Sequence, residues 1–98
     1  MKMLKKMKNK HIDKKFKEIG FKKSDENKYS VIYKRYNNEY EYTHIIHLIH
    51  KQNGKHIVQS YDEKAVIGWE GNIGIGLTMQ EMKLCYQKMK ALGWNFKK

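Results

Sequence analysis

The chain has 98 residues, of which 40% are hydrophobic and 12% aromatic, and these values are typical of a single globular domain over residues 1–98. A lone cysteine, Cys85, excludes an internal disulfide framework and fits the reducing cytoplasm, where we expect the protein to reside. No apolar run is long enough to cross a membrane and no signal-peptide core is present, so association with a membrane is not expected.

The formal net charge is +11, and it is concentrated at the start of the chain. Residues 1–23 hold ten lysines against Asp13 and Glu18, a local balance of +8. Such a basic end favours phosphate backbones or acidic protein surfaces. The alternative, that lysine is only the default solubilising surface residue of this chain, stays open.

Residues 1–19 are predicted to form a helix, because apolar side chains recur there at three- and four-residue spacing. The residues on this face are Leu4, Met7, His11, Ile12, Phe16 and Ile19. In an alternative, Asn9 is the N-cap and residues 1–8 are a frayed basic arm. The run Ile19-Gly20-Phe21 is typical of a Schellman stop, in which Gly20 has positive φ and Phe21 contacts Phe16.

The middle of the chain has a strand-like composition. Residues 22–27 are expected to be a polar loop, and residues 29–36, rich in tyrosine and β-branched residues, to be the first strand. Further along, residues 65–67 are an optional short fourth strand ahead of a glycine-rich loop at residues 68–76.

Residues 42–61 are predicted to form a β-hairpin, because Asn53-Gly54 suits the two positive-φ positions of a type I′ turn. A two-residue loop there sets a register in which His50 faces Ile57. Apolar residues occur on both faces of the strand before the turn, so we expect both faces to be covered. Helices would cover one face, and a second copy of the chain is the expected cover of the other, as a homodimer.

A second helix is predicted to begin after Thr78, because Thr78 and Glu81 form a capping box, and to end at Gly93-Trp94. Its predicted buried face consists of Met82, Cys85, Tyr86, Met89 and Leu92. The expected fold is therefore α+β with an α-β-β-β-α order, in which two helices pack on one face of an antiparallel sheet.

The sequence contains no recognisable catalytic or cofactor motif, so we expect no enzyme activity and no cofactor. His44, His47, His50 and His56 are the residues suited to a metal, but strand geometry separates them or places them on opposite faces, so no metal site is predicted. Cys85 lies on the apolar helix face and is expected to be a buried structural thiol.

Nucleic-acid binding is the chemistry that the composition favours, since lysines contact phosphates and tyrosines stack on bases. The predicted binding residues are Lys5, Lys6, Lys8, Lys10, Lys14, Lys15, Lys17, Lys22, Lys23, Tyr33, Arg35 and Tyr36. The predicted element order is also similar to that of double-stranded-RNA-binding domains, a likeness of topology alone.

Residues 16–21, the strand with Tyr33, and the ending at residues 77–94 resemble small uncharacterised proteins of phages and prophages from low-GC Gram-positive bacteria. The resemblance implies an α+β fold and this genomic setting. Our first hypothesis is a non-catalytic phage-type binding protein that contacts nucleic acid or a nucleoprotein complex through its Lys-rich N-terminal helix. The alternative is a phage-encoded inhibitor of a host protein, such as a CRISPR or other defence effector, which occupies an interface on an acidic or nucleoprotein partner.

Overall fold

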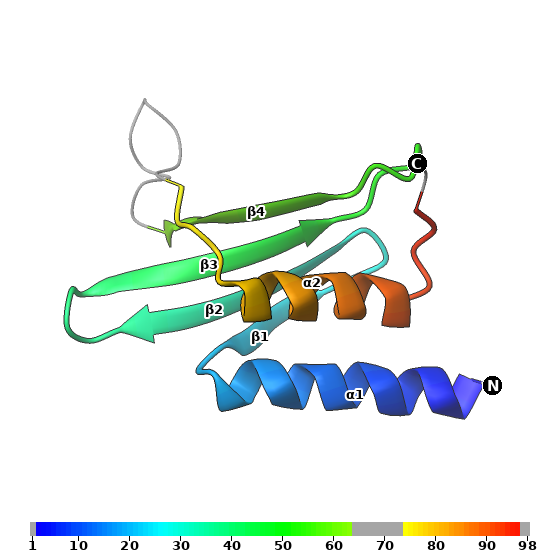
Figure 1. The fold of residues 1–98 in the computed structure, drawn as a ribbon, viewed down its shortest axis with the longest axis horizontal. Coiled ribbons are helices and arrows are strands. Elements are labelled where there is room, and N and C mark those ends of the chain that lie inside the picture. The colour runs from blue at the N-terminus through cyan, green and yellow to red at the C-terminus, as the bar shows by residue number, and fades with distance from the viewer. Residues whose placement is uncertain (1, 64–73, 97–98) are drawn as a thin grey trace.

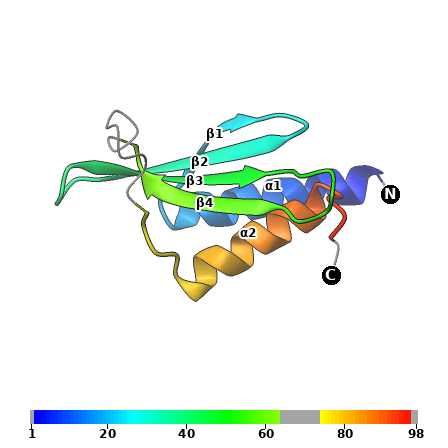
Figure 2. The same cartoon turned by 90° about the horizontal axis from the view of Figure 1, so that it is seen from above.

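The computed structural model describes residues 2–63 and 74–96, with side chains from residue 8 onward. Its elements, in chain order, are α1 (Lys2–Glu18), β1 (Lys22–Glu26), β2 (Ser30–Asn37), β3 (Tyr42–Ile49), β4 (Ile57–Asp62) and α2 (Met79–Ala91) (Figure 1). The four strands form one antiparallel sheet in the order β1-β2-β3-β4 (Figure 2). The predicted α+β class is confirmed.

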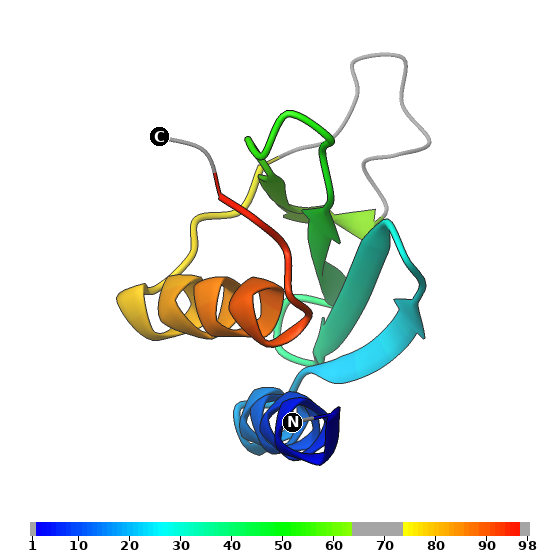
Figure 3. The same ribbon diagram turned by 90° about the vertical axis from the view of Figure 1, so that its right-hand side faces the viewer.

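Both helices lie on the same side of the sheet and run antiparallel to each other (Figures 1 and 3). Tyr33 and Arg35 are two residues apart and so share one face of β2. The Tyr33 ring stacks on Phe16 of α1 with 3.9 Å between centroids, and the Arg35 guanidinium is 3.2 Å from the Glu81 carboxylate of α2. The core between this face and the helices contains Ile12, Phe16, Phe21, Val31, Tyr33, Ile46, Leu48, Leu84, Cys85, Met89 and Trp94.

The end of α1 follows the prediction, and residues 2–8 lie within this helix. Gly20 has φ of 96°, and the Phe21 N–H donates to the Phe16 carbonyl over 2.9 Å. The rings of Phe16 and Phe21 meet edge to face at 6.1 Å, so the Schellman stop is confirmed.

The boundaries of α2 are also confirmed. The Thr78 hydroxyl accepts the Glu81 N–H at 3.0 Å, and the Glu81 carboxylate accepts the Thr78 N–H at 2.8 Å, which completes the capping box. At the other end Gly93 has φ of 80°, and the Trp94 N–H donates to the Met89 carbonyl at 3.1 Å.

The buried face of α2 differs from the predicted one. Met82 and Tyr86 are 51% and 50% exposed. The buried residues of the helix are Glu81, Leu84, Cys85, Lys88 and Met89. A hydrophobicity pattern assigns charged side chains to the surface, whereas Glu81 and Lys88 face inward because they find oppositely charged partners there.

The prediction of a loop at residues 22–27 is wrong, because residues 22–26 form strand β1 and pair with β2. As an edge strand β1 has one neighbour and mostly exposed side chains, so its polar composition is compatible with strand structure. The order of the described elements is therefore α-β-β-β-β-α, which departs from that of double-stranded-RNA-binding domains.

The predicted hairpin between β3 and β4 exists, but its register is shifted by one residue. Ile57 pairs with Ile49 rather than with His50, and residues 50–56 form a longer loop than the predicted two-residue turn. The loop is held by side chains, since His56 Nδ1 accepts the Lys51 N–H at 3.0 Å. A shift of one residue turns every β4 side chain to the opposite face, so Ser60 lies beside Ile46 on the helix side.

Two further expectations concern the segment after β4. The optional strand at residues 65–67 lies outside the described residues, as does most of the glycine-rich loop. At the end of that loop Gly74 forms an isolated bridge with Tyr61.

Among the described helices, none has the length and the apolar content needed to cross a membrane.

Candidate nucleic-acid interface

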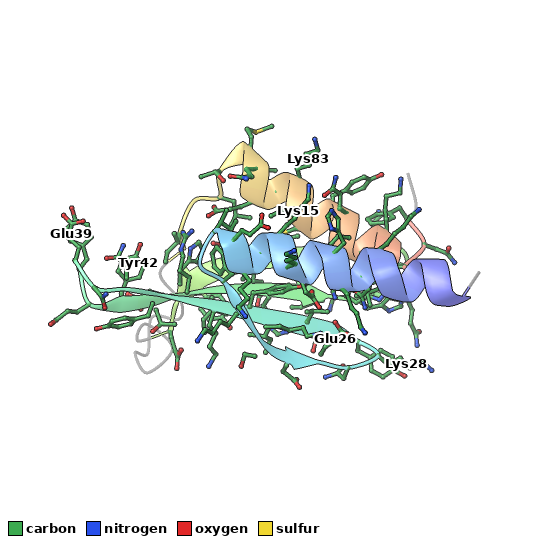
Figure 4. All side chains as sticks on the ribbon, turned by 90° about the horizontal axis from the view of Figure 1, so that it is seen from below. Lys15, Glu26, Lys28, Glu39, Tyr42 and Lys83 are labelled. Carbon is green, nitrogen blue, oxygen red and sulfur yellow. The ribbon has the colours of Figure 1, made fainter. Side chains whose placement is uncertain are left out.

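A groove runs along the outside of the helix layer, between α1 and α2. The side chains that line it are Lys8, His11, Ile12, Lys15 and Glu18 from α1, Ile19 directly after α1, and Gln80, Lys83, Leu84, Gln87, Lys90 and Ala91 from α2. We refer to it as the α1–α2 groove. Lys15 and Lys83 lie on its two walls, on the same side of the molecule (Figure 4).

Helical periodicity explains why these residues gather. Lys8 and Lys15 are seven residues apart, which is close to two helical turns, and Lys83 and Lys90 have the same separation. Each pair therefore lies on one side of its own helix. Because the helices are antiparallel, Lys8 lies near Lys90 at one end of the groove.

Among the described residues that line the groove, lysines outnumber carboxylates four to one. None of its four lysines (Lys8, Lys15, Lys83 and Lys90) forms an ion pair with another described residue, and Glu18 is the single carboxylate among the described lining residues. By contrast, ion pairs are formed by Lys23, Lys34, Arg35 and Lys88. Cations that face one another across a groove repel, and an anion placed between them removes that repulsion.

The predicted lysines divide between two surfaces. Lys8 and Lys15 line the groove. The other flank of α1, which faces β1, is lined by Lys10, Lys14, Lys17, Lys22 and Lys23. Lys23 is engaged there, at 2.9 Å from Asp13 and 3.2 Å from Glu26. Lys5 and Lys6 belong to α1, but their side chains are outside the described part of the chain.

The structure does not bring the predicted tyrosines to this surface. The prediction of Tyr33 as a binding residue is wrong, because its side chain is fully buried. Its hydroxyl donates to Asp13 over 2.5 Å. Arg35 is held by Glu81 and by the Ile19 carbonyl, 3.1 Å away, inside the helix–sheet interface. Tyr36 is exposed, but the alternation of β2 places it on the sheet face opposite the helices.

Sequence reasoning missed the second wall of the groove. Gln80, Lys83, Gln87 and Lys90 alternate at three- and four-residue spacing, which is the signature of one helix face. That polar stripe was visible in the sequence. Its opposition to α1 depends on the tertiary packing of the two helices.

A buried ionic cluster beneath the groove joins α1, α2 and β1. Lys88 has no exposed surface, and its ammonium lies 2.9 Å from Asp13 Oδ1 and 2.7 Å from Glu26 Oε1. It also donates to the side-chain carbonyl of Asn9. A buried cation needs such partners, because an unpaired charge in this position is strongly destabilising. The cluster thereby fixes the spacing between the two walls of the groove.

The cluster changes the acidity of its members. Burial alone would raise the pKa of Asp13, but hydrogen bonds from Tyr33, Lys88 and Lys23 outweigh it and hold the pKa below its ordinary value. Glu26 likewise has a lowered pKa, since Lys88 and Lys23 outweigh its burial. Burial, together with the bond to Asp13, raises the pKa of Tyr33, so its proton stays on the ring oxygen.

A second polar cluster contains a histidine and a serine in contact, but the ring proton of the histidine is placed on the wrong nitrogen for a nucleophilic site. His44 Nε2 is 2.6 Å from the Ser60 hydroxyl, and an Arg35 nitrogen is 3.4 Å from His44 Nδ1. A guanidinium can only donate, so Nδ1 accepts and the Nε2 proton is donated to Ser60. Burial and the charge of Arg35 lower the pKa of His44, which keeps the ring neutral. In this tautomer His44 orients Ser60 and does not take its proton, as a general base would.

The histidines near the β3–β4 loop come together in a way that the predicted register missed. The His50 and His56 rings are 4.8 Å apart, and each lies about 5 Å from Trp94. His56 uses both nitrogens, since Nδ1 accepts the Lys51 N–H and Nε2 donates to the Asn95 carbonyl at 2.5 Å. Within residues 2–63 and 74–96, no three His, Cys, Asp or Glu side chains are placed to share a metal ion.

The single thiol is equally unsuited to ligation or attack. Cys85 is buried in the core, and burial raises its pKa to about 12. Metal binding and nucleophilic attack both require the thiolate, which is scarce at neutral pH for such a group. This agrees with the structural role expected from the sequence.

Comparison with known proteins finds no family model, no curated protein and no solved structure that matches the chain. The resemblance to phage and prophage proteins stays an expectation from the sequence.

Proposed function

We propose that the protein is a non-catalytic nucleic-acid-binding protein that holds a phosphate backbone in the α1–α2 groove. One observation carries this proposal: four lysines from two helices converge on a single groove, and none forms an ion pair with another described residue. The lysines that face β1 add to the positive field around the same helix.

The remaining lining residues suit this ligand. Gln80 and Gln87 carry amide donors, and His11 carries a ring nitrogen that can donate to a phosphate oxygen. Contacts of this kind set the position of a nucleic acid without reading its bases. We therefore expect binding that is independent of sequence and strongly dependent on salt.

Fluorescence anisotropy of labelled oligonucleotides, titrated with the protein at several salt concentrations, tests the proposal. Binding should weaken as salt rises, with a slope of about 0.7 to 0.9 in the logarithmic plot for each phosphate neutralised. The double variant Lys15→Gln/Lys83→Gln removes one cation from each wall, so its slope should fall by roughly 1.5.

Lys34→Gln is the matched control for the single variant Lys15→Gln. Each change removes one lysine charge, but Lys34 lies on the sheet face opposite the helices and pairs with Glu63 at 3.5 Å. Lys34→Gln should keep the parental slope. Absence of binding at low salt, or equal slopes for the double variant and the parent, would overturn the proposal.

A further inference from the structure

Two exposed aromatic rings lie side by side at one end of the α1–α2 groove. Tyr86 of α2 is 50% exposed and Phe96 is 42% exposed, and their ring centroids are 5.2 Å apart. Phe96 in turn meets the His56 ring edge to face at 5.1 Å. We call these three residues the aromatic ledge.

Lys90 connects the ledge to the groove. It lines the groove beside Lys8, and its ammonium lies 5.4 Å from the centre of the Tyr86 ring. A strand whose phosphates follow the groove would therefore reach the ledge where its backbone passes Lys90. Lys90 therefore joins the lysines of the groove to the exposed ring of Tyr86.

The ledge is held in place by the segment that follows α2. This segment runs from the end of α2 towards the β3–β4 loop (Figure 1). Trp94 is buried, and the Asn95 carbonyl accepts a hydrogen bond from His56 at 2.5 Å. Phe96 is thus positioned next to Tyr86 before any ligand arrives, which lowers the entropy cost of stacking on it.

We infer that the ledge stacks unpaired bases, so that the ligand of the groove is a single-stranded nucleic acid. The inference rests on the proposed function and specifies its substrate class. Every base has a π-face that can stack on an aromatic ring, but in a duplex that face is covered by the neighbouring base pairs. The aromatic ledge beside the lysines of the groove can therefore stack on the unpaired bases of a single strand but not on the paired bases of a duplex.

Anisotropy titrations with Tyr86→Ala and Phe96→Ala test this inference, using a single strand, the corresponding duplex and an abasic strand of equal length. Each variant should bind the single strand about tenfold more weakly than the parent does. Its salt slope should be unchanged, because no charge is lost. Affinity for the duplex and for the abasic strand should stay at the parental value.

Tyr40→Ala is the matched control, since Tyr40 is 71% exposed in the turn between β2 and β3, far from the groove. Tyr86→Trp retains an aromatic face and should restore the affinity that Tyr86→Ala loses. Parental affinity of Tyr86→Ala and Phe96→Ala for the single strand, or equal losses on strand and duplex, would overturn the inference and leave the proposed function intact. If the parent protein itself binds none of these oligonucleotides, the proposed function is refuted.

Discussion

Lys88→Met is a direct test of the buried ionic cluster. Methionine keeps most of the volume of the lysine side chain but removes the ammonium. The Asp13 and Glu26 carboxylates are then left with Lys23 as their common cation, at 2.9 Å and 3.2 Å. One cation for two carboxylates leaves an uncompensated negative charge at the junction of α1, α2 and β1.

The size of the effect follows from how much water can reach that charge. Removal of one partner from a buried ion pair costs about 3–5 kcal/mol. The side chains of Asp13 and Glu26 are 22% and 26% exposed, so water offsets part of the loss. We therefore expect the free energy of unfolding to fall by about 3 kcal/mol, which lowers Tm by roughly 12–24 °C in a domain of this size.

The loss should also depend on pH. In the folded protein the pKa values of Asp13 and Glu26 lie below their ordinary values of 3.8 and 4.5. Their ionic contribution is therefore present above those values and is lost as the pH falls through the lowered pKa values. The difference in stability between parent and variant should be largest near neutral pH and should shrink below about pH 4.

Urea denaturation followed by circular dichroism at pH 7 and at about pH 3 measures both effects. Lys83→Met, on the exposed side of the same helix, is the control and should change the free energy of unfolding by less than about 0.5 kcal/mol. If Lys88→Met were as stable as Lys83→Met at pH 7, or if its loss were the same at both pH values, the ionic account of the cluster would be refuted.

Three further predictions concern buried groups. Tyr33→Phe removes the hydroxyl that donates to Asp13 over 2.5 Å, so urea denaturation at pH 7 should show a loss of about 1.5–3 kcal/mol, whereas a loss near zero would contradict that bond. The lowered pKa of His44 means that the folded state resists protonation below the ordinary value of 6.5, so stability should fall as the pH drops from 7 to 5. This fall should be smaller in His44→Gln, and urea midpoints that decline equally in both proteins would argue against a His44 pKa lowered by burial and by the charge of Arg35. The buried Cys85 thiol should react with a disulfide reagent only through unfolding, so Lys88→Met should speed labelling about 100-fold, and a rate independent of stability would exclude this route.

The helix boundaries could be predicted because their chemistry is local. The stop at Gly20 and the capping box of Thr78 and Glu81 each involve residues within one or two turns of one another. These contacts form wherever the helix packs. For the same reason the first helix was recognised from its apolar spacing alone.

The buried charges could not be predicted, because their partners are distant in the sequence. Lys88 and Asp13 are separated by 75 positions, and nothing near Lys88 indicates that it faces inward. The polar edge strand β1 was missed for the same reason, since it is a strand only because β2 lies beside it. The loop that joins β3 to β4 contains a bond from the Lys51 backbone to the His56 ring, which a turn dipeptide does not reveal.

The groove was partly visible from the sequence, and the part that was missed bears on function. The lysines of α1 were identified, whereas Lys83 and Lys90 were not among the predicted binding residues. Only the packing of α1 against α2 turns two ordinary basic stripes into one groove. The candidate site is therefore a property of the tertiary structure more than of any local motif.

The groove lysines should oppose folding slightly and favour binding, which separates a binding role from a solubilising one. Four cations without ion-pair partners among the described residues repel one another across the groove, so Lys15→Gln/Lys83→Gln should be as stable as the parent or slightly more stable. The same variant should bind nucleic acid more weakly, and a saturating oligonucleotide should raise the Tm of the parent more than that of the variant. Thermal denaturation with and without the oligonucleotide measures both quantities. A variant that unfolds at lower temperature and gains the same increase in Tm from the ligand would show that these lysines serve the fold and not a bound phosphate backbone.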